Sequence, residues 1–266
     1  MKPCAFDYAR PTSLAEAMAL IAAAPAAMVL AGGQTLGPML NLRLAQPSLL
    51  VDITRIPDLA ATAEERDAVT IGATVTHAAI EDGRIPDPTQ GFLPRVAHGI
   101  AYRAVRTRGT IGGSLAYADP AADWIACLAA LGAEAVIAGP HGAQRKVALT
   151  NLVLGAMQSA VAPGELITAV RVPKFSPAAR FGYHKICRRA GEYAEAIGVA
   201  VADPARGRYR LVASTTGAPL ILDSTERPPP AGLSAHLLAA GFAGDGVALS
   251  LASAALRRAL AAADRP

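Results

Sequence analysis

Apolar residues along this chain recur in two patterns, a helical one and a strand-like one, which alternate through the first two thirds of the sequence. Ser13 and Glu16 form a capping-box pattern where the first helical stretch begins, and Pro25 ends that stretch. The short apolar runs between helical stretches have the length of buried strands. The pattern predicts strands at 28–31, 49–53, 69–75, 134–138, 145–149 and 166–172, and helices from Leu14, over 39–44, after Thr76, over 93–101 and from Asp119.

The last third is ordered differently, because its predicted strands come first and its helices follow. A proline-containing linker at 173–177 precedes it. Strands followed by helices are typical of an α+β unit, in which helices cover one face of an antiparallel sheet. The expected strands are 181–186, 194–201 and 209–213, a three-stranded sheet, and the expected helices are 233–240 and 247–262.

Two glycine-rich turns interrupt the first part of this pattern. Residues 31–37 directly follow a predicted strand, and residues 108–114 follow a predicted helix. Adjacent residues without a Cβ let several backbone N–H groups point the same way, which forms a concavity for an anion such as a dinucleotide diphosphate. A single glycine-rich turn is more often an ordinary tight turn. The presence of two such turns favours a site in which both bind one diphosphate from opposite sides. The residues concerned are Ala31, Gly32, Gly33, Gln34 and Thr35, and Thr110, Ile111, Gly112, Gly113 and Ser114.

Neither turn matches the better-known nucleotide motifs. The chain contains no G-x-G-x-x-G, so the Rossmann fingerprint is missing. Gly32 and Gly37 have P-loop spacing, but Pro38 and Met39 stand where that motif needs a lysine and a hydroxyl residue. A Rossmann site and a P-loop are therefore both excluded.

Composition narrows the class of protein further. The chain of 266 residues has 52% hydrophobic residues, enough for buried cores, but only 17% charged ones. A surface with few charges fits burial against partner subunits, and an alanine-rich proteome explains it equally well. The net charge of +4 is scattered, with one dense basic run at 185–189, so nucleic-acid binding is not expected.

Cysteine usage and the N-terminal sequence bear on metal content and location. The three cysteines, Cys4, Cys127 and Cys187, are far apart, so they predict neither an iron–sulfur cluster nor a disulfide framework. Charged residues interrupt any signal-peptide core, and Pro25 breaks the longest apolar stretch, which is too short for a bilayer. A cytoplasmic protein without a membrane span is expected.

No catalytic constellation stands out among the side chains. The histidines are scattered without H-E-x-x-H spacing, no serine lies in a G-x-S-x-G elbow, and no carboxylates form a pair. We therefore expect no catalytic or metal-ligating residue of the chain itself. An enzyme with this sequence would take its reactivity from a cofactor.

Three further residues are candidates for contacts with that cofactor. Asp123 follows the second turn closely enough to accept hydrogen bonds from a ribose, although an acidic residue at a helix start is also ordinary capping. For Lys185 the sequence leaves two alternatives: a position near an anionic or electron-rich ring of the cofactor, or a position on a strand face exposed to solvent. Tyr193 stacks on a flat cofactor, or else is a half-buried aromatic residue of a sheet.

Several short motifs, in their order and separation, resemble one known family. They are Phe6-Asp7-Tyr8, residues 10–14, residues 31–35, Pro38-Met39, residues 43–45, Val51-Asp52-Ile53, residues 108–114, residues 118–121, residues 163–167, Arg188-Arg189 and Tyr193-Ala194. Together they resemble the medium, FAD-binding subunits of molybdenum hydroxylases, the family that includes carbon monoxide dehydrogenase and xanthine dehydrogenase. Tyr117 and Glu192 depart from the residues common in that family, His or Thr and Asp.

The resemblance implies an α+β protein with an FAD-binding fold of the vanillyl-alcohol-oxidase (PCMH) type. That fold would have two α/β subdomains, residues 1–55 and 56–175, followed by a C-terminal α+β domain, residues 176–266. The cofactor would be FAD, with its diphosphate at the two glycine turns and its ribose at Asp123. Leu166 and Ile167 would lie on the adenine side, and Lys185 and Tyr193 near the flavin.

The resemblance also implies partners and an activity. The chain would be an oxidoreductase subunit that passes electrons from [2Fe–2S] clusters of a small subunit through FAD to an external acceptor, while a large molybdopterin-binding subunit hydroxylates the substrate. A dimer of heterotrimers is the expected assembly. Two alternatives stay open: a self-sufficient FAD-dependent NADPH reductase on the same fold, and a flavin-free binding or assembly subunit.

Overall fold

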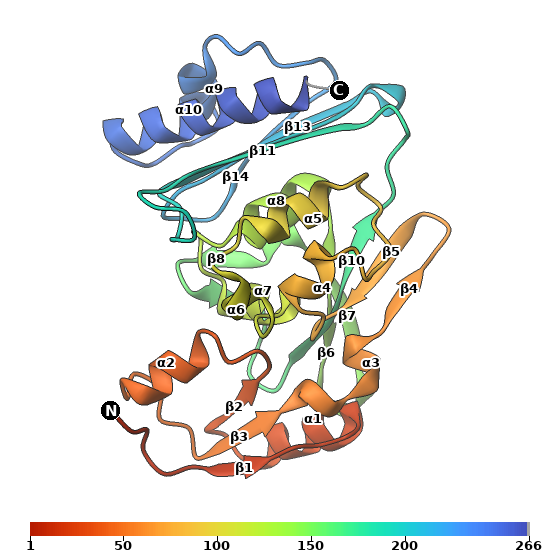
Figure 1. Ribbon diagram of the computed structural model, residues 1–266, viewed down its shortest axis with the longest axis vertical. Coiled ribbons are helices and arrows are strands. Elements are labelled where there is room, and N and C mark those ends of the chain that lie inside the picture. The colour runs from red at the N-terminus through yellow and green to blue at the C-terminus, as the bar shows by residue number, and fades with distance from the viewer. Residues whose placement is uncertain (265–266) are drawn as a thin grey trace.

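Three large β-sheets, each with its own helices, follow one another along the chain (Figure 1). The structure is a computed structural model and describes residues 1–264. The first sheet is parallel, with strand order β1-β3-β2, and α1 packs against β2 and β3. Its elements are β1 (Asp7–Ala9), α1 (Leu14–Ala23), β2 (Ala27–Leu30), α2 (Leu36–Asn41) and β3 (Leu49–Asp52), followed by the short helices η1 (Ile53–Arg55) and α3 (Pro57–Ala60).

The first helix begins where the sequence predicts, and the second does not. The Ser13 side chain accepts a hydrogen bond from the N–H of Glu16 at 3.2 Å, so α1 starts at Leu14. The helix predicted over 39–44 was placed too late, since α2 starts at Leu36, directly after the glycine turn. Pro38 is tolerated there because the first turn of a helix has no internal acceptor for its missing N–H.

The second sheet is antiparallel, has the order β4-β5-β10-β6-β7, and carries helices between β5 and β6. Residues 108–114 are not a simple turn: α7 begins at Ile111, with the Thr110 side chain capping it. The next helix starts at Asp123 and not at Asp119, because Ala118 adopts a left-handed conformation (φ 54°) and redirects the chain. The elements are β4 (Thr62–Glu64), β5 (Ala68–Gly72), α4 (His77–Glu81), α5 (Phe92–His98), α6 (Arg103–Arg106), α7 (Ile111–Tyr117), α8 (Asp123–Leu131), β6 (Glu134–Ala138), η2 (Pro140–Gly142), β7 (Gln144–Ala148), η3 (Leu149–Asn151), β8 (Val153–Gly155), β9 (Gln158–Ser159) and β10 (Leu166–Pro173).

The third sheet is antiparallel with four strands, so the prediction of three was wrong by one edge strand. The missed strand, β14, has only a short apolar run, 220–222, and pairs with β13 alone. Helices α9 and α10 cover one face of the sheet, as predicted (Figure 1). The elements are β11 (Arg180–Ile186), β12 (Ala196–Asp203), η4 (Pro204–Arg206), β13 (Arg208–Ser214), β14 (Leu220–Ser224), α9 (Leu233–Ala239) and α10 (Gly246–Ala263).

Helix α8 joins the second and third sheets into one core. Every residue of α8 is buried, and the helix packs against β12 and β13 on the face opposite α10. A helix that is apolar all round is stable only when surrounded, which the two sheets provide. The C-terminal sheet is therefore sandwiched between α10 and α8.

Helix α10 has the length and mean hydropathy, 1.3, of a membrane-crossing helix. In this protein it lies on the third sheet, with Ala255 and Leu256 fully buried. It approaches the sheet closely because Gly182 and Gly198 of the facing strands have no side chain. The apolar composition of α10 is therefore explained by its packing on the sheet.

Candidate functional site: a cavity between two glycine turns

The two glycine turns lie in contact, although they are remote in sequence. A Cβ added at Gly32 would lie 2.1 Å from the carbonyl oxygen of Arg108 and 2.8 Å from the Cα of Gly109. A Cβ added at Gly113 would lie 3.9 Å from the Cβ of Ala31. The first turn can approach the second only because residue 32 is glycine.

The two turns use their backbone N–H groups differently. The N–H of Gly112 donates to Ala73 O (2.9 Å) and that of Gly113 to Thr110 Oγ1 (3.1 Å), so these donors are already satisfied. Among residues 1–264, the N–H groups of Gly33, Gln34 and Thr35 donate to no carbonyl or side chain. Unpaired amides on one turn are available to bind an anion, and a diphosphate has oxygens that accept from several of them. The first turn thus offers free amides, and the second offers the Thr110 and Ser114 hydroxyls beside them.

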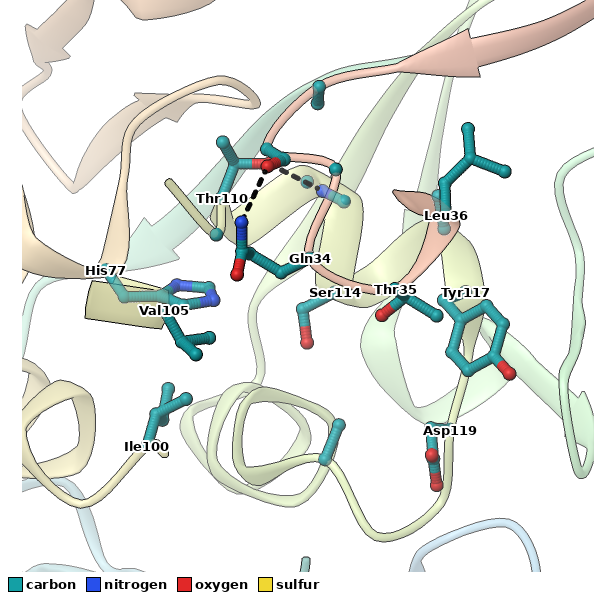
Figure 2. A pocket seen from close by; sticks show the side chains of 18 of the residues that line it. Gln34, Thr35, Leu36, His77, Ile100, Val105, Thr110, Ser114, Tyr117 and Asp119 are labelled. Atoms are coloured by element: carbon teal, nitrogen blue, oxygen red, sulfur yellow. Dashed lines mark hydrogen bonds between the residues drawn. The ribbon is translucent and has the colours of Figure 1, made fainter. Parts of the chain in front are cut away.

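A cavity of about 640 Å³ opens beside the two turns. Figure 2 shows it extending from His77, Ile100 and Val105 at one end to Tyr117 and Asp119 at the other. All the site residues predicted from the sequence line this cavity except Ile111, whose side chain is fully buried in the core. Those that line it are Ala31, Gly32, Gly33, Gln34, Thr35, Thr110, Gly112, Gly113, Ser114, Asp123, Leu166, Ile167, Lys185 and Tyr193.

Asp123 and Lys185 form a buried ion pair that links α8 to β11. Lys185 Nζ lies 3.0 Å from Asp123 Oδ1 and donates to Gly99 O at 2.7 Å, and the Tyr183 hydroxyl donates to the same carboxylate oxygen. Burial and the nearby Asp123 charge raise the pKa of Tyr183, which keeps this donor protonated. Within the part of the chain that the structure describes, Asp123 Oδ2 has no partner. The carboxylate therefore joins α8 to β11 with one oxygen and leaves the other for a ligand.

The loop between β11 and β12 of the third sheet reaches the rim of the cavity. Its Gly191 has φ 86°, and a Cβ there would lie 3.1 Å from the Tyr102 ring. Tyr193 and Tyr102 are both largely exposed, at 62% and 64%. Two aromatic side chains thus flank the opening, where a flat group could stack on them.

Sequence reasoning missed the other wall of the cavity. His77, Ile100, Ala101, Tyr102 and Val105 line it, and none belongs to a glycine motif. One signal was present: His77 follows a predicted strand closely, as the first glycine turn does, and binding residues are frequent in the connections that follow such elements. The segment 100–102 has no comparable signal, because tertiary contacts alone bring it here.

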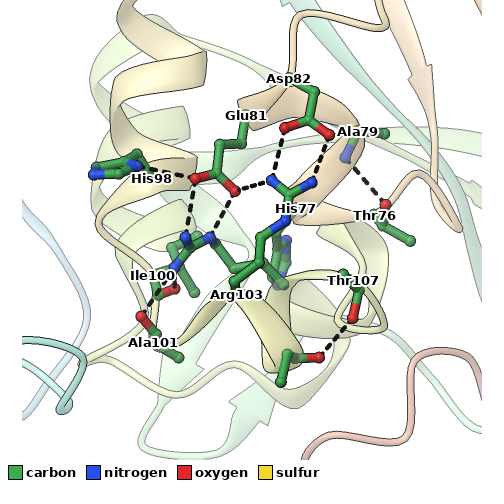
Figure 3. A network of polar contacts seen from close by, with 12 residues as sticks. Thr76, His77, Ala79, Glu81, Asp82, His98, Ile100, Ala101, Arg103 and Thr107 are labelled. Carbon is green, nitrogen blue, oxygen red and sulfur yellow. Dashed lines mark hydrogen bonds and ion pairs between the residues drawn. The ribbon is translucent and has the colours of Figure 1, made fainter.

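A cluster of charges holds that wall in place (Figure 3). The Arg106 side chain, 7% exposed, donates to both Glu81 carboxylate oxygens and, through Nη1, to Ile100 O (2.9 Å) and Ala101 O (3.0 Å). Arg103 bridges Glu81 and Asp82, and His98 Nδ1 lies 2.9 Å from Glu81 Oε1. Arg106 therefore fixes the backbone of the cavity wall, including Ala101 with its φ of 42°.

This cluster predicts a loss of stability in acid. The Arg106 hydrogen bonds lower the pKa of Glu81 from 4.5 to about 2. Because the folded pKa lies below the unfolded one, the carboxylate stabilises the fold fully above pH 4.5 and loses that contribution as the pH falls toward 2. We expect Glu81→Gln to unfold with a flatter dependence on pH in this window, measured by urea titration at each pH. Glu226→Gln, at an exposed carboxylate, is the control; equal slopes for both variants would contradict the prediction.

The fold and the cavity define a class of protein. Two apposed glycine turns, free amides on one of them and a long cavity with an aromatic rim are suited to a dinucleotide cofactor. Among residues 1–264, no group of three or more His, Cys, Asp or Glu side chains is arranged to hold a metal ion. The site is therefore that of a dinucleotide-binding protein of the mixed α/β kind.

Comparison with known proteins specifies the family. Residues 4–175 match the FAD binding domain in molybdopterin dehydrogenase, and the chain belongs to this family. The family resemblance and the cofactor predicted from the sequence, FAD, are thereby confirmed.

Relatives and solved structures agree with this assignment. The chain is 40% identical over 195 residues to the 6-hydroxypseudooxynicotine dehydrogenase complex subunit alpha of Paenarthrobacter nicotinovorans, covering 73% of this chain and 66% of that protein. It is 38% identical to the carbon monoxide dehydrogenase medium chain of Afipia carboxidovorans, over 78% of this chain and 72% of the relative. A carbon monoxide dehydrogenase structure from Hydrogenophaga pseudoflava superposes with a TM-score of 0.88 at 31% identity, over 99% of this chain and 98% of the other. The expected fold class is confirmed.

Proposed function

We propose that this chain is the FAD-binding, electron-transferring subunit of a heteromeric molybdenum hydroxylase. The single observation that carries the proposal is the contact between the two glycine turns, which leaves the amides of Gly33, Gln34 and Thr35 facing one cavity. The relatives whose names include a dehydrogenase subunit or medium chain support the same assignment.

The residues at the cavity fit FAD in charge and in shape. The free amides of the first turn and the hydroxyls of Thr110 and Ser114 would hold the diphosphate, and Asp123 Oδ2 would accept from a ribose hydroxyl. Leu166 and Ile167 would give apolar contacts on the adenine side, and Lys185 and Tyr193 would lie near the flavin. When bound, FAD supplies a redox centre that accepts electrons singly and releases them in pairs. The chain's own residues would bind and orient it.

The rest of the reaction belongs to partner chains in this proposal. The cysteines Cys4, Cys127 and Cys187 are unpaired and far apart in sequence, so iron–sulfur clusters would come from a small 2×[2Fe–2S] subunit. A large molybdopterin-binding subunit would hydroxylate the substrate, in a cytoplasmic dimer of heterotrimers. The units 1–55, 56–175 and 176–266 would be two FAD-binding subdomains and the C-terminal domain.

Purification of the tagged chain with and without its genomic neighbours tests this function. We expect a yellow protein that releases FAD on denaturation and that copurifies with a molybdopterin-type and a cysteine-rich chain. Substrate of the complex should then bleach the flavin absorbance, whereas NADPH should not bleach it in the isolated chain. Bleaching of the isolated chain by NADPH would support the self-sufficient reductase, and a colourless chain that cannot be reconstituted with FAD would contradict both redox functions.

A further inference from the structure

His77 is a buried side chain at the edge of the cavity, outside both glycine motifs. It is the first residue of α4, its N–H donates to Gly109 O at 2.9 Å, and only 5% of the residue is exposed. It nevertheless lines the cavity, and Figure 2 shows its ring pointing inward between Thr110 and Val105. The part of the ring that faces the cavity can therefore contact a bound ligand.

The hydrogen bond from Trp124 decides which ring nitrogen carries the proton. Trp124 Nε1 lies 3.0 Å from His77 Nδ1, and an indole N–H can only donate. Nδ1 of His77 is therefore an acceptor, so the neutral ring has its proton on Nε2. Burial and the positive charge of Arg106 lower the pKa of His77 to about 4, which keeps the ring neutral at physiological pH.

The Nε2–H is left without an acceptor by the protein. Within the described residues, 1–264, it forms no hydrogen bond, and because His77 lines the cavity this donor is open to a ligand there. A Cβ at Gly109 would lie 2.9 Å from Nε2, so glycine at that position keeps the atom uncovered. Gly109 does not have a positive φ, so its lack of a side chain matters for space, beside His77 and beside Val105 O, which a Cβ would approach to 3.2 Å.

We propose that the Nε2–H of His77 donates a hydrogen bond to bound FAD, which makes His77 a cofactor-positioning residue. This inference rests on the proposed function, because it requires FAD in the cavity. Trp124 acts through His77: its indole fixes the tautomer and the ring orientation, as an outer partner does for a metal-bound histidine. The pair would supply a neutral donor whose orientation is fixed by the Trp124 hydrogen bond.

Titration of the flavin-free full chain with FAD, followed by quenching of flavin fluorescence, tests the proposal in three variants. His77→Phe keeps a flat aromatic ring, although a somewhat larger one, but loses the donor, and we expect about tenfold weaker FAD binding. His77→Gln can accept from Trp124 through its amide oxygen and donate through its amide nitrogen, so its affinity should stay within about threefold of the wild type. His236→Phe, at an exposed position of α9, is the matched control and should bind normally.

A measurement on the unmodified protein guards against variants that do not fold. In protein labelled with ¹⁵N-histidine, the Nε2 resonance of His77 should shift when FAD is added, and that of His236 should not. Two results would overturn this inference alone, provided that the wild type binds FAD normally. One is a His77 resonance that does not shift on binding, and the other is a His77→Phe variant that binds FAD as tightly as the wild type. Absence of FAD binding by the wild type would overturn the proposed function itself.

Discussion

Replacing Gly32 by alanine is expected to weaken FAD binding by about 100-fold. The new methyl group would lie 2.1 Å from Arg108 O and 2.7 Å from Arg108 C, and both are backbone atoms that cannot rotate away. The two turns must then separate, at a cost of about 3 kcal/mol, the upper end for an overpacked site. Because both turns would hold the diphosphate, this cost reduces the free energy of FAD binding. Each 1.4 kcal/mol raises the Kd about tenfold, so about 3 kcal/mol raises it about 100-fold.

Gly37→Ala is the matched control, because it makes the same chemical change a few residues further along. A Cβ at Gly37 meets no atom within 4 Å, so FAD affinity should stay close to that of the wild type. Affinity is measured by fluorescence titration, and circular dichroism checks that Gly32→Ala keeps its secondary structure. Wild-type affinity in a folded Gly32→Ala protein would show that the contact between the turns does not serve the cofactor.

The glycine turns could be predicted from the sequence because their requirement is local. A pair of glycines after an apolar run has few explanations, and the residues around Gly32 and Gly113 do line the same cavity. Strand and helix spacing likewise located α1, β5, β6 and β10 within a few residues. Edge strand β14 was missed because its apolar run is short and only one neighbour stabilises it. Helix α7 was taken for a turn because two glycines weaken helix propensity. In the structure, Thr110 caps it, and its first N–H groups donate to Val75 O and Ala73 O in the segment that follows β5.

The remainder of the site depends on contacts that no local pattern records. The wall at Ile100 and Ala101 is placed by Arg106, whose partner Glu81 lies in a different helix. His77 gains its orientation from Trp124, 47 positions further along the chain. Asp123 was predicted as a ligand of the cofactor, but its role in joining α8 to Lys185 follows only from the packing of the third sheet. Long-range packing therefore completes a site whose glycine turns the sequence already indicates.

The second large effect is expected for Gly182→Ala in β11. A Cβ at this position would lie 1.8 Å from the carbonyl oxygen of Ala259 in α10, and the contact is again with backbone. The helix must lift from the sheet and uncover its apolar face, which includes Ala255 and Leu256. We expect a loss of about 3 kcal/mol in the free energy of unfolding. For a chain of this size that lowers Tm by roughly 5 °C.

Gly246→Ala provides the control for this helix. Gly246 is the first residue of α10, a Cβ there meets nothing within 4 Å, and alanine favours helix more than glycine does. Its Tm should therefore equal or slightly exceed that of the wild type in a thermal melt monitored by circular dichroism. Because β11 also carries Lys185, Gly182→Ala should in addition bind FAD more weakly as the temperature approaches its Tm, while Gly246→Ala should not. Equal melting temperatures for the two variants would mean that α10 does not lie against Gly182, and the close approach of helix and sheet would have to be abandoned.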